Sequence, residues 1–339
     1  MTQLSICMPS NRVLKDSIAS IESAIAYCRQ TDAVLIVSDN SEDPEKREFL
    51  QGHSGDLIYV SSVNTSAAEN WKRAFAAAET AFIMPMGDDD LIFADPAQPA
   101  LDLATLGGDY IGAFAVNIAF TQAHGPLARK TLSLTADDPA ERMKGYLDNA
   151  GGNNSNYYSM YRRDVFGGLL SLFLSAHPTQ GSYCDWALSL ALVSSGKMAH
   201  DPGTVFHYNM DNWGSREKID ALNTTIYTAV GLPEGSDRYE HLLMFLDLYV
   251  MAARKDTPLT EPQKTKLAND IVLMTMGRFV RRVKQTPDDY DETTRYLVEL
   301  AMAEQNSLGI FQIALMMADI LQPGLKDRYV EFFRRAVAA

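Results

Sequence analysis

The sequence predicts an α/β domain with a mixed, mostly parallel sheet, followed by a bundle of α-helices. Within the first ninety residues, short apolar runs alternate with stretches of helical periodicity. Polar loops directly follow several of these runs, and residues 226–339 hold no convincing strand pattern. Such alternation is typical of layered domains with a buried parallel sheet. We therefore expect one α/β domain over residues 1–225 and a separate helical domain over 226–339.

Four apolar runs predict the first strands, and helical patterns lie between them. The strands are expected at 4–8, 33–37, 57–60 and 81–84. Apolar residues recur at helical spacing over 18–28, and the capping-box pattern Ser66–Glu69 opens a second helix. Ligands gather at the carboxyl ends of parallel strands. The sequence therefore predicts that the polar loops after three of these strands meet at one edge of the sheet, at 9–12, 38–43 and 87–90.

The later elements follow from weaker patterns. We expect strands at 111–119 and 156–161, a helix within 131–148, and a helix over 185–195 that Gly196 ends. From about Tyr239 onward the pattern is helical, with Pro262 at a first-turn position.

Composition excludes several classes of protein. A net charge of -13 over 339 residues argues against a nucleic-acid binder, which needs clustered Lys and Arg. The three scattered cysteines form no metal or redox spacing and fit a reducing cytosol. The N-terminus lacks a signal-peptide pattern, and no run approaches the ~20 apolar residues that span a bilayer. We expect a cytoplasmic protein, with peripheral contact at the inner face of the membrane left open by the cationic run Arg278–Lys284.

The stretch Met84–Phe93 (MPMGDDDLIF) places three consecutive aspartates beyond the fourth predicted strand. Mg²⁺ and similar hard cations are typically held by one or two carboxylates together with substrate phosphates. An acidic, solvated turn explains the same letters, and both interpretations stay open for this stretch alone. An EF-hand is excluded because Ile92 and Pro99 stand where oxygen ligands are required.

Other catalytic signatures fail. A P-loop is excluded because Ala191 and Met198 replace its first glycine and its Ser or Thr. There is no dinucleotide-binding GxGxxG after the first strand and no GxSxG elbow. His200 and His207 are too far apart in sequence for a zinc motif.

Several separated blocks resemble the motifs of family 2 glycosyltransferases, which have the Rossmann-like GT-A fold. The blocks occur in the family's order over about residues 1–210: Ser5–Arg12, Val37–Asp43, Asn64–Asp90, Tyr158–Phe166 and Cys184–Leu190.

Two positions depart from the family pattern, and one region falls outside it. Glu69 stands where many relatives have Arg, and Cys184 replaces the usual acid before Asp185. The helical segment 226–339 matches no family pattern that we can name.

The resemblance implies a set of nucleotide-sugar contacts. Pro9, Asn11 and Arg12 border the base of the donor, and Asp39 hydrogen-bonds it, with uracil the expected base. Asn70 belongs to the same nucleotide-binding set.

The resemblance also assigns the aspartate triplet and the catalytic base. Asp88 meets the ribose, and Asp90 or Asp89 holds Mn²⁺ or Mg²⁺ on the diphosphate, with Asp90 preferred. His207 is a further candidate metal ligand, and Asp185 is the general base.

Residues 211–218 are expected to form a flap over the diphosphate through Trp213, Arg216 and Lys218. Structural roles compete with some of these assignments: Asp185 suits a helix N-cap, and His207 suits a structural histidine.

The function expected from the resemblance is an inverting, metal-dependent glycosyltransferase of hexosyltransferase type. It moves a sugar from a nucleotide-diphosphate donor, expected to be a UDP-sugar, to a hydroxyl of a glycan or lipid-linked acceptor, as in surface polysaccharide biosynthesis. The alternatives are a non-catalytic binding or scaffold protein on the same fold, and a sugar nucleotidyltransferase. The sequence does not identify the sugar or the acceptor, and it leaves homo-oligomerisation open.

Overall fold

The computed structural model describes residues 3–213 and 216–338, apart from the side chains of Asn212, Arg216 and Asp220. The chain forms two compact units. The first contains 1–137, 145–171 and 196–214, and the second contains 138–144, 172–195 and 215–339. Each unit therefore draws on more than one segment of the chain. The domain boundary that we predict at 225 and 226 stays a prediction.

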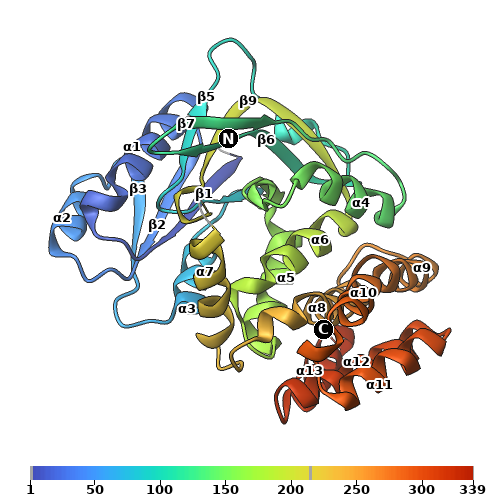
Figure 1. Cartoon of the computed structure of the whole chain (residues 1–339). Coiled ribbons are helices and arrows are strands. Elements are labelled where there is room, and N and C mark those ends of the chain that lie inside the picture. Colours follow the sequence, from blue (N-terminus) through green and yellow to red (C-terminus); the bar gives the residue numbers. More distant parts are fainter. Residues whose placement is uncertain (1–2, 214–215, 339) are drawn as a thin grey trace. The chain divides into compact units, whose positions relative to one another are not determined.

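The first half of the sheet in the first unit is parallel. Its strands run in the order β3-β2-β1-β4, and their bounds are Leu57–Ser61, Val34–Asp39, Leu4–Ser10 and Phe82–Pro85. β1 pairs in parallel with both β2 and β4, and β2 pairs in parallel with β3. The four predicted strands are confirmed, and their carboxyl ends face one edge of the sheet (Figure 1).

The second half of the sheet has mixed directions. It continues in the order β8-β6-β9-β5, and β7 pairs with β6 outside this order. The bounds of β8, β6, β9, β5 and β7 are Met160–Arg162, Tyr110–Thr121, Lys197–Asn209, Leu91–Ala94 and Gly125–Lys130. β8 is antiparallel to β4 and β6, whereas β6 and β9 are parallel. The predicted strand at 156–161 is wrong in its first half, because a 3₁₀ turn covers Ser155–Tyr157.

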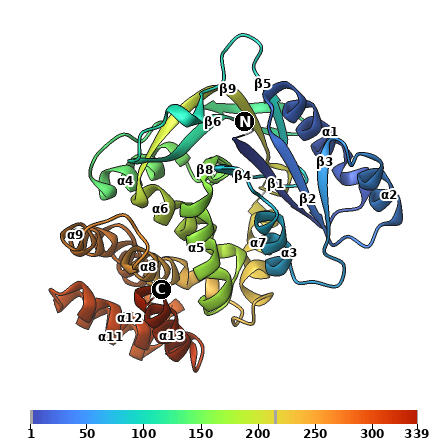
Figure 2. The same ribbon diagram turned by 180° about the vertical axis from the view of Figure 1, so that it is seen from behind.

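Helices cover both faces of the parallel strands. α1 (Leu14–Thr31) packs apolar residues against one face, where Ile21 and Ile25 share a core with Ile6 and Met8. α3 (Ala67–Ala76) contacts β1 and β2, and Ser66 caps its first turn by accepting a hydrogen bond from Glu69 N. α2 (Pro44–Gly52) follows β2, and Figure 2 shows it beside β3 in the reverse view. These helices fix where the strand-end loops point.

The second unit is helical. Its helices are α6 (Asp185–Ser195), α7 (Arg216–Thr228), α8 (Glu240–Ala253), α9 (Glu261–Ile271), α10 (Gly277–Gln285), α11 (Glu292–Ala303), α12 (Ser307–Leu321) and α13 (Leu325–Ala338), with a π-helical turn at Val272–Met276. α4 (Pro139–Ala150) and α5 (Arg163–Ala176) have residues in both units. α8 is central, because almost all of its residues from Leu242 to Ala252 are buried.

From residue 216 to residue 338 the secondary structure consists of helices and turns without strands, as predicted. Among the residues that the structure describes, no helix is both long and apolar enough to cross a bilayer.

Candidate active site

The three polar loops that follow β1, β2 and β4 meet at one edge of the sheet, as predicted. The loop after β1 donates two backbone N–H groups, from Asn11 and Arg12, to the carboxylate of Asp88 in the loop after β4, each over 3.1 Å. The loop after β2 reaches the first loop through Asp43, which accepts a hydrogen bond from Leu14 N at 2.7 Å. Backbone and side-chain contacts thus join the loops into one surface.

Asp88 anchors the aspartate triplet to the end of β1. Besides the two backbone groups, its carboxylate accepts hydrogen bonds from the Ser10 hydroxyl at 2.6 Å and from Arg12 Nε at 3.1 Å. Arg12 also donates from Nη2 to Asp89 at 2.7 Å. A carboxylate held by this many donors has one orientation, so Asp88 sets the position of the residues that follow it.

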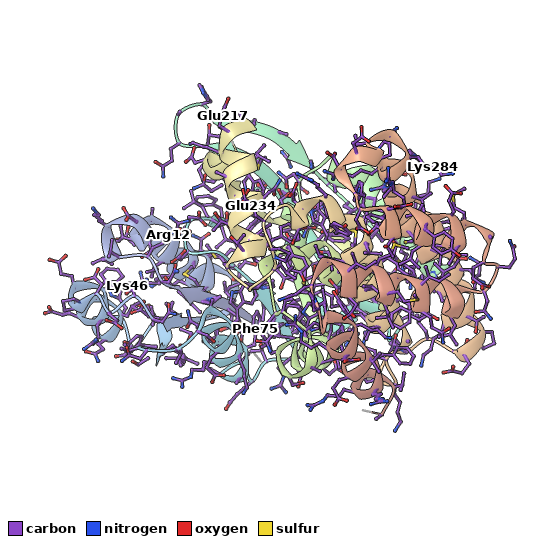
Figure 3. All side chains as sticks on the ribbon, turned by 60° about the horizontal axis from the view of Figure 1, so that its bottom comes forward. Arg12, Lys46, Phe75, Glu217, Glu234 and Lys284 are labelled. Carbon is purple, nitrogen blue, oxygen red and sulfur yellow. The ribbon has the colours of Figure 1, made fainter. Side chains whose placement is uncertain are left out.

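Lys46 is a buried cation that sequence reasoning missed. Its side chain is fully buried, and Nζ lies 3.2 Å from Asp39 Oδ1. The same amino group donates to the Ser10 hydroxyl and to the carbonyl of Arg12, the latter at 2.7 Å. Figure 3 shows Arg12 and Lys46 close to each other at this edge. Because Ser10 in turn donates to Asp88, Lys46 links the loop after β2 to the aspartate triplet.

Asn70 hydrogen-bonds to the ends of both β1 and β2 and so joins the first two loops. Its Nδ2 group donates to the carbonyl of Ser10 at 3.2 Å and lies 3.3 Å from Asn40 Oδ1. Its Oδ1 atom is buried and has no hydrogen-bond partner within the described part of the chain. A buried acceptor without a donor is costly, so this oxygen is a candidate ligand-binding atom.

Two carboxylates of the triplet converge over Gly87. A Cβ atom on Gly87 would lie 2.7 Å from Asp90 Oδ2 and 3.1 Å from Asp89 Oδ1. Any side chain at this position would displace them. Glycine thus leaves room for the two carboxylates to lie over the backbone in this arrangement.

The charge of Asp89 is partly offset by Arg12, whereas that of Asp90 is poorly compensated. Asp90 is 2% exposed, and its Oδ1 accepts a hydrogen bond from Asn209 N at 2.8 Å. Burial, and then the charge of Asp89, raise the pKa of Asp90 well above its usual range. Burial also raises the pKa of Asp89, although the charge of Arg12 opposes that shift. Among the ion pairs of the described residues, none involves Asp90.

This donor set fits a hard divalent cation. Mg²⁺ and Mn²⁺ prefer carboxylate oxygens, and one or two protein carboxylates suffice when phosphates complete the coordination. Asp89 and Asp90 offer two such oxygens on the same side of Gly87. A dication would stabilise the charged form of Asp90, whose pKa is raised by burial and then by the charge of Asp89.

His207 lies on β9 opposite Leu91 of β5. Its ring packs against Phe93 and Phe120, with centroid distances of 5.0 and 5.8 Å, and burial lowers its pKa. Within residues 3–213 and 216–338, His207 does not form a three-residue ligand cluster with the aspartates. Its role as a metal ligand stays a prediction.

Two further residues near the triplet were not anticipated. The charge of Asp211 reaches Asp89 and helps to raise the pKa of that residue. Asn209 orients Asp90 through its backbone. Their signal in the sequence was weak because β9 itself was not predicted: its alternation is broken by Asp201–Gly203, where the pairing with β6 shifts register.

Asp185 belongs to the second unit, where it is the first residue of α6. Its backbone is already helical, with φ -55° and ψ -39°. Its Oδ1 atom accepts a hydrogen bond from the next amide, Trp186 N, at 2.7 Å. An N-cap residue has a non-helical backbone and usually binds the second or third amide, so the geometry differs from that of a cap.

The remaining predicted residues lie in several elements. Pro9 pairs with Ser38 across β1 and β2. Trp213 ends the 3₁₀ turn Asp211–Trp213, and Lys218 is exposed on α7. The side chain of Arg216 lies outside the described residues, so the flap stays a prediction.

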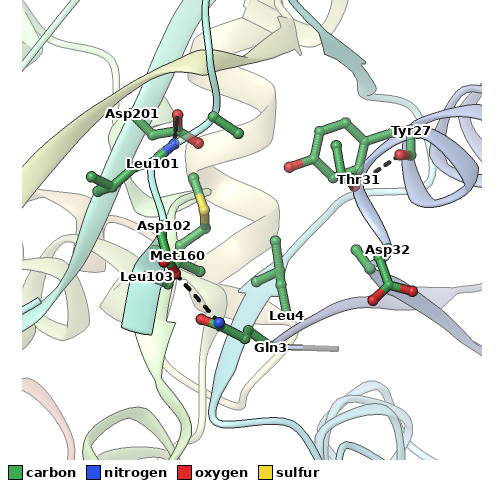
Figure 4. A pocket seen from close by; sticks show the side chains of 12 residues that line it. Gln3, Leu4, Tyr27, Thr31, Asp32, Leu101, Asp102, Leu103, Met160 and Asp201 are labelled. Atoms are coloured by element: carbon green, nitrogen blue, oxygen red, sulfur yellow. Dashed lines mark hydrogen bonds between the residues drawn. The ribbon is translucent and has the colours of Figure 1, made fainter. Parts of the chain in front are cut away.

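The first unit also contains a cavity of about 210 Å³, and Figure 4 shows side chains that line it. Gln3 and Leu4, at the start of β1, line it together with Asp201 and Tyr27. The aspartate site lies at the other end of that strand, beyond Ser10, so the cavity is separate from it.

The half-parallel sheet, with carboxylates at its strand ends, defines a GT-A-type α/β domain accompanied by C-terminal helices. Residues 5–170 match the family model described as glycosyl transferase family 2. This part of the chain belongs to that family, which confirms the resemblance in the sequence. A comparison with curated proteins finds no match.

Solved structures of S. aureus TarS match this chain at low sequence identity. The structure of TarS 1-349 has 10% sequence identity and a TM-score of 0.45, and the match covers 94% of this chain and 92% of that chain. The structure of TarS 1-349 in complex with UDP has 12% identity and a TM-score of 0.43 with the same coverage. The structure described as that of TarS has 10% identity and a TM-score of 0.45, and the match covers 92% of this chain and 55% of that one.

Proposed function

We propose that the protein is an inverting, metal-dependent glycosyltransferase that uses a UDP-sugar and a hydroxyl acceptor on a glycan or lipid-linked glycan. The convergence of Asp89 and Asp90 over Gly87, at the strand ends of a family 2 domain, carries the proposal. An acidic turn without a ligand would not need two repelling carboxylates gathered around a glycine. Surface polysaccharide assembly is the expected setting.

The nucleoside binds between the loops after β1 and β2 in this proposal. Asp39 accepts a hydrogen bond from the uracil ring, and Lys46 holds the Asp39 carboxylate in place. Pro9 and Asn11 border the base, and Asn70 holds the loops after β1 and β2 together through its Nδ2 group. The ribose contact assigned to Asp88 would use a carboxylate that already accepts several hydrogen bonds, so these contacts favour a positioning role for Asp88.

The diphosphate lies over the aspartate triplet. Asp90 and Asp89 would hold Mn²⁺ or Mg²⁺, with Asp90 the principal ligand and His207 a candidate further ligand. A bound dication supplies Lewis-acid stabilisation of the negative charge on the departing diphosphate. Arg12, already paired with Asp89, adds a positive charge beside the same group.

Asp185 acts as the general base. It removes the proton from the acceptor hydroxyl while that oxygen attacks the anomeric carbon of the donor sugar. The bond from this carbon to the phosphate oxygen breaks on the opposite face, and UDP leaves with the electron pair. A single displacement of this kind inverts the anomeric configuration.

Release of UDP tests the proposal. The purified protein is incubated with a panel of UDP-sugars and Mn²⁺, with and without glycan acceptors, and free UDP is measured. We expect UDP release that stops when Mn²⁺ is chelated and in Asp90→Asn. Asp95→Asn, on an exposed turn after β5, is the matched control and should keep wild-type activity. No release from any donor would contradict the proposal.

The role of the base has its own control. Asp185→Asn should lower kcat by about 10²- to 10⁴-fold, the usual range for a general base. Asp164 lies in the first turn of α5, and its carboxylate also accepts a hydrogen bond from the next amide, at 2.9 Å. Asp164→Asn should therefore leave kcat unchanged.

These measurements also distinguish the alternatives. A scaffold protein predicts that Asp185→Asn keeps the biological activity of the wild type. A nucleotidyltransferase predicts pyrophosphate release from a nucleoside triphosphate and no UDP release from UDP-sugars.

A further inference from the structure

A fully buried polar cluster lies directly before Asp185 in the second unit. His177 Nε2 lies 2.8 Å from Asp247 Oδ1, and the Tyr329 hydroxyl donates to the same oxygen at 2.8 Å. The thiol of Cys184, which immediately precedes Asp185, lies 3.6 Å from His177 Nε2. The cluster thus joins α8 and α13 to the segment that leads into α6.

His177, Cys184 and Asp247 have the residue types of a metal site, and their ligand atoms lie within 4.8 Å of one another. The hydrogen bonds of His177 argue against one. Its Nδ1 atom accepts from two backbone amides, Thr179 N at 3.2 Å and Gln180 N at 2.9 Å. The ring proton is therefore on Nε2, where it points to Asp247 instead of leaving a lone pair for a metal.

The imidazole ring of His177 instead connects the bundle to a tight turn. Its Nδ1 atom accepts hydrogen bonds from the two amides of the turn, and its Nε2 atom donates to Asp247 of α8. Gln180, in that turn, has a φ of 55°, a left-handed conformation that is uncommon for a residue other than glycine. From α13, Arg328 donates to the carbonyl of Pro178 at 3.1 Å. The turn is held from two helices of the bundle.

The other end of α6 is held by arginines. Arg142 donates to the carbonyls of Val193 and Ser194, at 2.7 and 2.6 Å. Arg254, at the end of α8, donates to the Ser195 hydroxyl at 2.8 Å. These contacts satisfy carbonyls and a hydroxyl at the helix C-terminus, where cations are favourable.

Between its two ends, α6 is buried on all sides. Every residue from Ala187 to Ser195 is buried, and only Asp185 and Trp186 are partly exposed. Asp185 is therefore at the tip of a helix whose remaining length is fixed within the bundle.

We propose that the C-terminal helices α8 and α13 position the catalytic base, and that Asp247 and Tyr329 act on Asp185 through His177. This inference rests on the proposed function, because it takes Asp185 as the base. It gives the C-terminal helices a role in catalysis without any contact to substrate. Asp247, His177 and Tyr329 are positioning residues.

The composition of the cluster supports this role. A buried carboxylate without a cationic partner costs free energy, and one of its oxygens, Asp247 Oδ2, is left without a hydrogen-bond partner in the described structure. Apolar residues in the same place would stabilise the contact without the free-energy cost of burying polar groups. The hydrogen bonds, unlike apolar packing, are directional and fix the orientation of the turn before Asp185.

The test uses substitutions at Asp247 and Tyr329 in the full chain. Asp247→Leu removes the acceptor, whereas Asp247→Asn keeps an oxygen that accepts from both His177 and Tyr329. We expect Asp247→Leu to lower kcat by about 10- to 100-fold, as small misplacements of catalytic groups do, with the Kd for UDP and Mn²⁺ unchanged. Asp247→Asn should retain kcat within about threefold of wild type by the same reasoning.

Tyr329→Phe is the second variant, to be used if Asp247→Leu fails to fold. Its matched control is Tyr290→Phe. The Tyr290 hydroxyl donates to the carbonyl of Arg238 at 2.9 Å in the same bundle. The Tyr290→Phe variant therefore also loses one hydrogen bond from a tyrosine hydroxyl. We expect kcat to fall in Tyr329→Phe and to stay at the wild-type value in Tyr290→Phe. Equal kcat values in the two variants would overturn the inference.

Hydrogen exchange separates this inference from the proposed function. We expect faster amide exchange over residues 178–190 in Tyr329→Phe than in wild type and in Tyr290→Phe. Unchanged exchange over 178–190 would overturn the positioning inference whether or not the protein transfers a sugar. Faster exchange in Tyr329→Phe, together with no transferase activity in the wild type, would support the positioning and contradict the proposed function.

Discussion

Replacing the buried Lys46 tests the connection between the nucleoside loop and the aspartate triplet. Lys46→Met keeps the length of the side chain but removes its charge and its three donors. Asp39, which is 2% exposed, would then lose its cation and keep a hydrogen bond from Ser41 N at 3.1 Å. Removing one partner of a buried ion pair costs about 3–5 kcal/mol, because the other charge stays buried. We expect a loss of this size in the free energy of unfolding.

Urea denaturation of four proteins measures this effect: the wild type, Lys46→Met, Asp39→Asn and the double variant. The double variant should be more stable than Lys46→Met alone, because it removes the stranded charge, with a coupling energy of roughly 1–3 kcal/mol. Lys72→Met is the control: its amino group pairs with Glu69 at 3.6 Å on an exposed surface, so a change below about 1 kcal/mol is expected. A loss of less than about 1 kcal/mol in Lys46→Met, or no recovery in the double variant, would show that Lys46 and Asp39 are not a coupled buried ion pair.

Three further predictions concern single residues. Asp88→Asn replaces a carboxylate that accepts several hydrogen bonds, so we expect a loss of about 2 kcal/mol in the free energy of unfolding. Calorimetry should also show weaker UDP binding. An unchanged midpoint of urea denaturation would contradict this prediction. Asp90→Asn should raise the Tm of the metal-free protein at neutral pH. The pKa of Asp90 is raised in the folded state, so its contribution to stability is present below the pKa of the unfolded state, about 3.9, and is lost as pH rises through the pKa of the folded state. The Tm difference should therefore grow from pH 4 to pH 7, and a constant difference would count against it. Burial, followed by Arg278 and Arg282, lowers the pKa of His241 to about 4, so its contribution to stability is complete above about 6.5 and is lost as pH falls toward 4. His241→Gln should flatten the Tm profile over that interval, and an unchanged slope would show that the residue is not the titrating group.

The parallel half of the sheet was predictable because its strands are continuous apolar runs. A strand buried on both faces needs apolar residues at every position, so β2 and β4 stand out in the sequence. The convergence of the strand-end loops then follows from the parallel direction alone. The same reasoning located the aspartate triplet before any contact was known.

The mixed half of the sheet was harder to predict for local reasons. β9 contains Asp201, Pro202 and Gly203, which read as a turn, yet the strand continues past them with a shift in register against β6. β8 is only three residues long, Met160–Arg162, so its pattern cannot be distinguished from the adjoining 3₁₀ turn. Neither element has enough periodicity to be identified alone.

The positions of the charged groups also depend on tertiary structure. Lys46 lies in a helix with the charged sequence Pro44–Gly52, which reads as a solvent-exposed segment. Its burial arises because α2 packs beside the loop after β1, and no local pattern records that contact. Asp247 lies in a largely apolar helix, and its partners His177 and Tyr329 are far away in sequence.

Binding of Mn²⁺ in the presence of UDP tests whether Asp89 and Asp90 hold the metal. Titration calorimetry on the wild type, Asp90→Asn and the control Asp95→Asn would measure the Kd for Mn²⁺ with UDP held at saturation. We expect one metal site per chain in the wild type and in Asp95→Asn, and a Kd for Mn²⁺ at least about tenfold weaker in Asp90→Asn, since a principal metal ligand is lost. Equal Mn²⁺ affinity in Asp90→Asn and the wild type would contradict the assignment of the carboxylates over Gly87 as the metal site.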